Sequence, residues 1–289
     1  MRIAILTTNS EPEADQRLIE EGEKRGHEML IYDVLRCYAN LSLEQSDIHY
    51  RGKGRDVIEN IDAIIPRIDI PYTKYGLAIL RQFEAKGVYV LNDATSMAAG
   101  RDKFRSFQKL VEHQLPVPTT AFAHSLEDTE NLIKLVGGAP LIVKLAEGTQ
   151  GIGVVLAGNH SAAKSVINSF LQLGADIVVQ EYIEESAGTD IRCIVIGDQV
   201  VATMERKAQK GEFRANISLG ATSSKVEITP EEREIAITAS WALGLNCSGV
   251  DIVRSNRGPL VIEVNVSAGF TGEFGIEEIS GVNLSLIHI

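Results

Sequence analysis

Cysteine is scarce in the 289-residue chain: it has three, and none belongs to a C-x-x-C pair. Their odd number and wide spacing argue against a disulfide scaffold and a structural zinc site, and they fit a reducing compartment. Long apolar runs are missing as well. No stretch reaches the ~20 apolar residues of a membrane span, and the short apolar run after Arg2 cannot serve as a signal peptide. We therefore expect a cytoplasmic protein with no membrane partner.

Basic residues are outnumbered. The chain has 28 lysines and arginines against 39 aspartates and glutamates, a formal net charge of -11. Nucleic-acid binding depends on neutralising phosphates with basic side chains, so we expect no direct contact with nucleic acid. A hydrophobic content of 44% is ordinary for a soluble globular protein with a core. At roughly 150 residues per domain, the length predicts two domains or three small ones.

Common catalytic signatures are missing. No G-x-G-x-x-G follows the first predicted strand, which argues against a dinucleotide site of that kind. No G-x-S-x-G marks a nucleophile elbow, and the six histidines show no metal-ligand spacing. We therefore assign no covalent nucleophile to this protein.

Residues 1–103 alternate between predicted strands and helices. The strands are 3–6, 29–32, 61–65 and 88–91, with Pro66 ending the third, and the helices are 14–25 and 75–86. This rhythm predicts a parallel sheet with helices on its faces. The segment 48–56, with a basic glycine turn from Arg51 to Arg55, is most simply an exposed hairpin.

The pattern changes near residue 103, where we place the domain boundary. A helix is predicted at 103–112, and Pro116 and Pro118 stop it. Residues 104–289 then read as an α+β domain rich in strands, with two further helices at 162–173 and 230–243; Thr229 is expected to cap the second in a capping box. The chain ends on an apolar run, from which we expect a final element to be missing.

Residues 140–156 contain two apolar runs around a loop with three glycines, E-G-T-Q-G-I-G. The backbone of such a loop can approach an anion closely, and Lys144 lies just upstream in an otherwise apolar strand. We interpret the loop as a flap over phosphates with Lys144 beneath it. The alternative is a plain glycine hairpin whose Lys144 reaches solvent at a sheet edge.

The next candidate is the strand 177–183, which ends in Glu181 and Tyr182. Backbone groups at such a strand end could meet the edge of an adenine. Asp190 begins the following strand, where its carboxylate could accept hydrogen bonds from ribose hydroxyls. Each acid taken singly is more simply a solvated strand end.

A hairpin at 251–265 places Glu263 and Asn265 on the same face of one strand, about 7 Å apart along it. Asp251 on the facing strand could add a third oxygen donor. Such hard donors suit Mg²⁺ or Mn²⁺ held together with substrate phosphates. The alternative is a solvated strand end. Two observations argue against it: Glu263 lies within an apolar run, and burying an unpaired carboxylate is costly.

The run 205–216 is basic within an acidic protein. It is either a mobile surface loop or a loop that brings Arg206 and Arg214 onto a reacting phosphate or carboxylate, because arginine binds such groups in a bidentate manner.

In this order the motifs resemble the ATP-grasp superfamily of carboxylate–amine ligases, and within it the RimK family. The segments that carry the likeness are RDK (101–103), VGGAP (136–140), EGTQGIGVV (147–155), DIR (190–192), FRAN (213–216) and GVDI (249–252), with IHY (48–50), PRI (66–68) and LRQF (80–83) in the first domain. The resemblance implies a pre-ATP-grasp domain followed by an ATP-grasp domain. One departure is Ala268, where relatives usually carry proline.

The resemblance also implies an ADP-forming enzyme that adds L-glutamate to the C-terminal tail of a small-subunit ribosomal protein. ATP would contact Lys144, Glu181, Tyr182, Asp190, Arg214, Ala215 and Asn216, with Lys103 as a weaker phosphate candidate. Asp251, Glu263 and Asn265 would bind two divalent cations, Mg²⁺ or Mn²⁺. Arg206 and Arg214 would stabilise the acyl phosphate. Three points stay open: a different acceptor (a small-molecule cofactor or an amino-acid carrier), a non-catalytic ATP-binding module, and a homo-oligomer.

Overall fold

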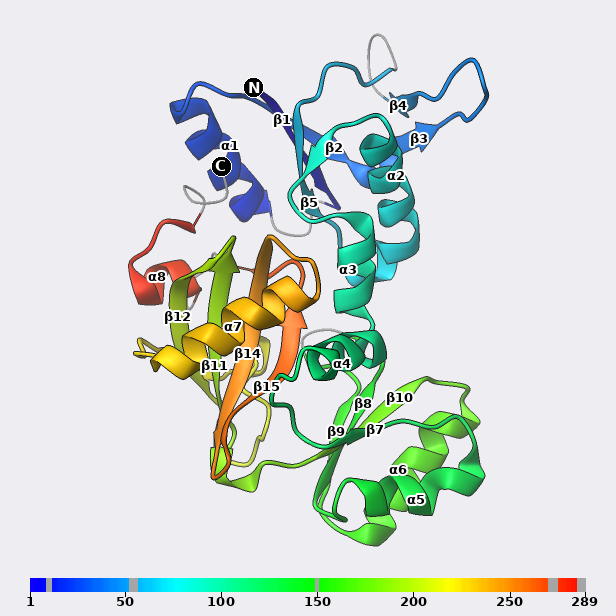
Figure 1. Cartoon of the computed structure of the whole chain (residues 1–289), viewed down its shortest axis with the longest axis vertical. Helices are drawn as coiled ribbons and strands as arrows, with labels where there is room; N and C mark the ends of the chain where they lie inside the picture. The colour runs from blue at the N-terminus through cyan, green and yellow to red at the C-terminus, as the bar shows by residue number, and fades with distance from the viewer. Residues whose placement is uncertain (9–11, 52–56, 149–150, 270–274, 285–289) are drawn as a thin grey trace.

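The computed structural model describes residues 1–8, 12–51, 57–148, 151–269 and 275–284. Its first domain contains a parallel sheet of order β2-β1-β5-β6, formed by β1 (Arg2–Thr7), β2 (Glu28–Asp33), β5 (Ala63–Arg67) and β6 (Tyr89–Val90). Helices α1 (Pro12–Lys24) and α2 (Thr73–Ala85) lie on opposite sides of it (Figure 1).

Alternation along β1 explains this arrangement. Successive strand side chains point to opposite faces, and Ile3 and Ile5 pack with α1 whereas Ala4 and Leu6 pack with α2. The predicted parallel sheet is confirmed, but the prediction that Pro66 ends its strand was wrong. Pro66 lies inside β5, beyond the two residues that pair with β6, so its missing N–H costs no hydrogen bond to that strand.

A two-stranded hairpin of β3 (Cys37–Ala39) and β4 (Ile48–Tyr50) projects from the first domain (Figure 1). The exposed hairpin predicted at 48–56 falls in part on residues 52–56, which lie outside the described residues. On either side of them, His49 and Val57 form an antiparallel bridge.

Helices α3 (Ala94–Arg101) and α4 (Lys103–Glu112) connect the two domains. The sequence predicted only the second of them. Asp93 begins α3 by accepting hydrogen bonds from the Thr95 and Ser96 amides. Asp102 ends α3 in an extended conformation and caps α4 in the same way.

The second domain contains two antiparallel sheets. The smaller, of order β7-β10-β8-β9, consists of β7 (Thr120–Ala121), β8 (Leu141–Leu145), β9 (Val154–Ala157) and β10 (Ile177–Glu181), and α5 (Thr129–Leu135) and α6 (His160–Gln172) pack on it. The larger, of order β13-β12-β11-β14-β15, consists of β11 (Thr189–Ile196), β12 (Gln199–Lys207), β13 (Thr222–Ser224), β14 (Cys247–Ser255) and β15 (Gly258–Asn265).

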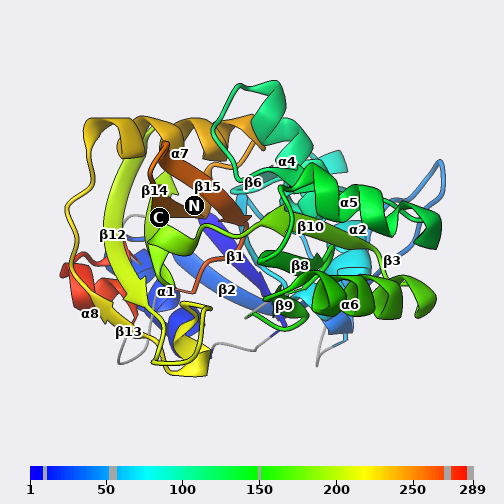
Figure 2. The same cartoon turned by 90° about the horizontal axis from the view of Figure 1, so that it is seen from below.

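Helix α7 (Pro230–Ala242) covers one face of the larger sheet, and α8 (Ile276–Ser280) packs against β12 (Figures 1 and 2). The capping box of α7 is present, since the Thr229 hydroxyl accepts from the Glu232 amide and the Glu232 carboxylate accepts from the Thr229 amide. The prediction of two helices in this domain was too few. Short α5 and α8 form as well, because Leu132 and Ile133 of α5 and Ile276 of α8 are buried in tertiary contacts.

The two sheets of the second domain belong to separate apolar clusters. One cluster runs from the first domain through α3 and α4 into the layer between α7 and the larger sheet. The smaller sheet has a core of its own with α5 and α6. Helix α7 covers one face of the larger sheet, and α5 and α6 cover one face of the smaller sheet (Figure 2). Residues on the other faces line the cleft between the sheets, apart from the part of the larger sheet that packs against α8. In the described part of the chain, no helix is both long enough and apolar enough to span a membrane.

Candidate active site between the two sheets

A cleft of roughly 920 Å³, part of it open to solvent, separates the two antiparallel sheets of the second domain. Among the described residues, every predicted site residue except Asn265 lines it: Lys103, Lys144, Glu181, Tyr182, Asp190, Arg206, Arg214, Ala215, Asn216, Asp251 and Glu263. Residues far apart in the sequence are therefore brought to one place.

Lys144 lies on β8, between β9 and β10, so the alternative of a lysine at a sheet edge was wrong. Its Nζ donates to Gln180 Oε1 at 2.7 Å, and Gln180 Nε2 donates to the Thr120 hydroxyl at 2.8 Å. Burial lowers the pKa of Lys144 to about 8, against the charge of Glu263, which raises it. The ammonium is thus held in place with no carboxylate in direct contact among the described residues, as a site for an incoming anion requires.

The glycine loop connects β8 to β9; its Thr149 and Gln150 lie outside the described residues. Gly151 has a φ of +75°, and a Cβ added there would lie 2.9 Å from Asn216 Oδ1. Arg214 Nη1 donates to the Gly151 carbonyl at 2.9 Å. The loop therefore packs directly against residues 214–216, which were predicted to reach the phosphates. Its role as a phosphate flap stays a prediction.

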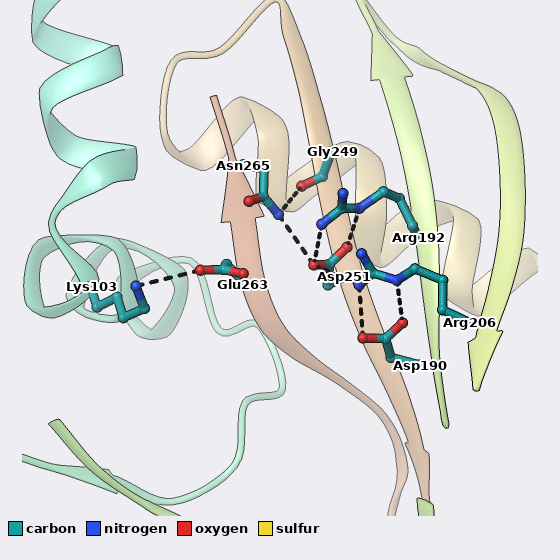
Figure 3. Close-up of polar contacts among 8 residues, drawn as sticks. All are labelled: Lys103, Asp190, Arg192, Arg206, Gly249, Asp251, Glu263 and Asn265. Atoms are coloured by element: carbon teal, nitrogen blue, oxygen red, sulfur yellow. Dashed lines mark hydrogen bonds and ion pairs between the residues drawn. The ribbon is translucent and has the colours of Figure 1, made fainter. Parts of the chain in front are cut away.

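Four charged side chains form a buried network on β11, β12 and β14 (Figure 3). Arg206 donates two hydrogen bonds of 2.7 Å to the Asp190 carboxylate, and Arg192 donates two of 2.8 and 2.7 Å to the Asp251 carboxylate. A second contact of Arg206, 3.0 Å to Asp251 Oδ2, joins the two pairs. Both alternatives for the run 205–216 placed Arg206 on a loop, and this was wrong, because Arg206 lies on β12 and is 4% exposed. Asp190 is buried too, so it is no solvated strand end.

The two aspartates differ in pKa. Burial raises the pKa of Asp190 above its usual range, against the opposing charge of Arg206. Burial also disfavours the charged form of Asp251, but Arg192 and Arg206 together outweigh it and hold the pKa of that carboxyl below its usual range. The two carboxylates balance the two guanidiniums in charge. Removing any one of the four would leave an uncompensated charge in the protein interior, which is strongly destabilising.

Asp251 also orients Asn265. Asn265 Nδ2 donates to Asp251 Oδ2 at 3.2 Å and to the Gly249 carbonyl at 3.3 Å. Two acceptors on the same side fix which end of the amide is nitrogen, so Oδ1 points away from Asp251 (Figure 3). The amide oxygen, which is the atom that a cation would need, takes no part in these two hydrogen bonds.

Glu263 stands opposite Asp251 in the β14–β15 register. A register shift beside this pair lets the consecutive residues Ile262 and Glu263 both line the cleft. The Glu263 side chain is 36% exposed and lies 3.5 Å from Lys103 Nζ. The expectation of a buried, unpaired Glu263 was therefore wrong; the buried acid is Asp251, and arginines already compensate it.

These donors fit a hard divalent cation in part. In the described ranges no three His, Cys, Asp or Glu side chains converge as a closed metal site would require. Glu263 and the Asn265 amide oxygen offer oxygen ligands, and Asp251 could join only by sharing its carboxylate with Arg192 and Arg206. Mg²⁺ commonly takes few protein ligands and completes its shell with water and phosphate oxygens. The residues thus suit a cation that binds together with a phosphate ligand.

Part of the cleft wall is apolar. Ile183, Val253 and Ile262 line the cleft, and they belong to a small apolar cluster with Leu260. Glu181, at the end of β10, accepts two bonds from Arg257 in the β14–β15 turn, at 3.0 and 2.8 Å. Apolar and charged side chains in the wall of one cleft suit a ligand that has both an apolar and an anionic part.

Sequence reasoning missed three residues of this site: Gln180, Arg192 and Arg257. Each acts as the partner of a predicted residue, so only the folded structure identifies it. For Arg192 a signal existed, since Asp190 and Arg192 are two charges spaced by two in an otherwise apolar strand and hence share a face.

Two family models match nearly the whole chain. Residues 1–97 match the RimK PreATP-grasp domain, and residues 100–287 match the RimK-like ATP-grasp domain. The chain belongs to the RimK-like ATP-grasp family. It is therefore an ATP-dependent ligase with a pre-ATP-grasp domain and an ATP-grasp domain, which confirms the predicted fold and enzyme class.

Close relatives extend over nearly the whole chain. A protein of Hahella chejuensis named "Probable alpha-L-glutamate ligase 1" is 52% identical over 99% of this chain and 92% of its own length. A "Probable alpha-L-glutamate ligase" of Pseudomonas aeruginosa is 50% identical over 100% of this chain and 94% of its own length.

Solved structures with the same fold are more distant in sequence. The ATP-grasp ligase PsnB complexed with minimal precursor has a TM-score of 0.74 at 22% identity, covering 99% of this chain and 96% of that one. D-alanine–D-alanine ligase from Bacillus anthracis complexed with ATP has a TM-score of 0.68 at 18% identity, covering 99% and 94%. These similarities establish the ATP-grasp fold independently of the family match.

Proposed function

We propose that this enzyme is an α-L-glutamate ligase that adds L-glutamate to the C-terminal carboxylate of a small-subunit ribosomal protein, with ATP converted to ADP. The names of its close relatives support glutamate as the amine substrate, and the resemblance to the RimK family supports the acceptor. The observation that carries the proposal is that Lys144 on one sheet and Glu263 on the other line the same cleft, near enough for the charge of Glu263 to raise the pKa of Lys144.

In this proposal the adenine occupies the apolar part of the cleft beside Glu181 and Tyr182, and the phosphates extend toward Lys144. Arg214, Ala215 and Asn216 reach the phosphates from the loop packed under Gly151. Lys103 Nζ, which also donates to the Gly148 carbonyl at 3.2 Å, is a further phosphate contact. Asp190 keeps its carboxylate on Arg206, so a ribose hydroxyl would have to share it.

The reaction proceeds in two transfers. A carboxylate oxygen of the acceptor attacks the γ-phosphorus of ATP, which forms an acyl phosphate and releases ADP. The amine of glutamate then attacks the acyl carbon, inorganic phosphate leaves, and an amide remains. Glu263, Asn265 and Asp251 would hold one or two Mg²⁺ or Mn²⁺ ions, whose chemistry is to neutralise charge on the transferred phosphoryl group.

The residues of the chain supply the rest of the catalysis. Lys144 places positive charge at the phosphates, and Arg206 and Arg214, which both line the cleft, would stabilise the acyl phosphate and its oxyanion. Closure of the glycine loop would exclude water, which would otherwise hydrolyse the acyl phosphate. No step needs a nucleophile from the protein, consistent with the sequence.

The test is ADP release and product mass after mixing the enzyme with ATP, Mg²⁺, L-glutamate and small-subunit ribosomal proteins. We expect one acceptor to gain the mass of one or more glutamyl residues. Glu263→Ala should lower the rate by about 100-fold or more, whereas Asp198→Ala, at the exposed β11–β12 turn, should leave it unchanged.

Other outcomes separate the alternatives. A glutamyl mass added only to a small molecule or to an amino-acid carrier would replace the ribosomal acceptor but keep the ligase chemistry. Nucleotide binding without ADP formation under any acceptor would indicate a non-catalytic ATP-binding module. Undiminished ADP release by Glu263→Ala would overturn the cation assignment.

A further inference from the structure

Asn92 connects the first domain to the strands of the active site. It lies between β6 and α3, and it is 3% exposed. Its Oδ1 accepts from the amides of Asn246 and Cys247 at 2.9 and 3.0 Å, and its Nδ2 donates to the carbonyls of Cys247 and Val266 at 2.7 and 3.2 Å. Both donors and both acceptor positions of the side-chain amide are used.

These partners lie beside the predicted cation ligands. Cys247 begins β14, which carries Asp251 and the Gly249 carbonyl that binds the Asn265 side chain. Val266 follows Asn265 directly. One side chain of the first domain therefore fixes the relative position of β14 and the end of β15 at the point where Asn265 must present its oxygen.

Helix α3 holds Val266 in a second way. A Cβ on Gly100 would lie 2.3 Å from Val266 Cγ1, so the Val266 side chain occupies the space that glycine leaves on the helix. The position of Asn92 is itself fixed on both sides. The Leu91 amide donates to the Ile64 carbonyl of β5 at 2.9 Å, and Asp93 caps α3. The main chain after Asn265 thus contacts a part of the first domain that is itself hydrogen-bonded on both sides.

We propose that Asn92 is a positioning residue for the cation-binding end of the active site, acting through the main chain on both sides of Asn265. This inference rests on the proposed function, because it assumes that Asn265 is a cation ligand. It assigns the first domain a part in cation binding that the cleft residues alone do not reveal. Partners that orient metal ligands typically change metal affinity by about 10- to 100-fold when removed.

Asn246 offers a matched control. Its Nδ2 donates to the Leu91 carbonyl at 2.8 Å, so it joins the same two segments of the same two domains, but its side chain does not contact Val266. Asn246→Ala and Asn92→Ala both remove hydrogen bonds from this junction. Only the second removes the contact to the residue that follows Asn265.

The experiment measures Mn²⁺ binding by electron paramagnetic resonance in the full-length protein at a fixed concentration of ADP, with a protein-free reference. We expect Asn92→Ala to weaken Mn²⁺ binding by about 10- to 100-fold and Asn246→Ala to change it by less than about twofold. ADP affinity in EDTA should be unchanged in both variants. Gly100→Ala, which displaces Val266 through its side chain, should also weaken Mn²⁺ binding, and it keeps the test valid if Asn92→Ala fails to fold.

Equal weakening in Asn92→Ala and Asn246→Ala would overturn the inference, since the contact would then serve domain packing alone. That result would leave the proposed function intact, provided the wild-type enzyme still ligates glutamate. If wild-type protein with ADP binds no Mn²⁺, the cation assignment and the inference both fail.

Discussion

Arg192 and Asp251 face each other across β11 and β14 and are joined by two hydrogen bonds of 2.8 and 2.7 Å (Figure 3). The acid expected to bind a cation is thus already neutralised before any ligand arrives. Its second arginine, Arg206, also binds Asp190. We therefore expect a cation in this site to rely first on Glu263 and Asn265, while Asp251 orients the Asn265 amide.

Arg192→Ala should therefore destabilise the protein. It leaves the buried Asp251 carboxylate with a single guanidinium, and we expect a loss of about 2–3 kcal/mol in the free energy of unfolding in urea. Arg192→Lys keeps the charge but not the two-pronged geometry and should recover only part of the loss. A change below about 0.5 kcal/mol for Arg192→Ala would contradict the structural role of the pair.

Nucleotide affinity should depend on pH through Lys144. Its folded pKa of about 8 lies below the ordinary 10.5, so the charged form is disfavoured in the free protein. Glu263, Lys103, Asp251 and Asp190 are the charged groups around it. The ammonium is lost as pH rises through about 8, so metal-free ADP affinity should fall about tenfold between pH 7 and pH 9.

The matched variant for this measurement is Lys144→Met. It should bind ADP more weakly at pH 7 and show no such decline up to pH 9, because the titrating group is gone. Folding stability changes with pH in the opposite direction to ADP affinity. Between pH 8 and 10.5 the unfolded chain holds a proton that the folded chain has released, so the cost of burying this ammonium is present below pH 8 and is relieved as pH rises. A decline of equal slope in Lys144→Met would exclude Lys144 as its origin.

Gly151 and Gly174 provide a comparison of two glycines with the same backbone. Their φ values are +75° and +72°, so alanine at either position should cost about 1–2 kcal/mol. A Cβ at Gly174 meets nothing within 4 Å, whereas at Gly151 it meets Asn216 and Arg214. Gly151→Ala alone should raise the KM for ATP, by several-fold, in steady-state assays. Equal KM values in the two variants would argue against a nucleotide contact through residues 214–216.

The sequence predicted those parts of the site that depend on local pattern. The strand carrying Lys144 and the β14–β15 hairpin each have a distinct apolar run, and they form where expected. The Arg192–Asp251 pair could not be predicted, because it depends on the register of two strands that lie 59 residues apart at this point. The exposure of Glu263 was misjudged for a related reason, since the register shift beside it breaks the simple alternation of strand faces.

Helix α3 shows most clearly what the sequence could not predict. It has eight residues, contains Thr95 and Gly100, and presents no long apolar stripe, so helical periodicity is weak. Its cap, Asp93, was visible in the sequence, but the burial of Met97 and the fit of Val266 against Gly100 arise only in the folded protein. The same helix and the preceding Asn92 support the end of β15, so the missed element is part of the site.

A structure of the protein with ADP and Mg²⁺ tests the central claim most directly. The account predicts that the β-phosphate contacts Lys144 and that Mg²⁺ lies between this phosphate and the side-chain oxygens of Glu263 and Asn265, with Arg192 still paired to Asp251. A nucleotide bound elsewhere, or Mg²⁺ with no ligand from either Glu263 or Asn265, would contradict it.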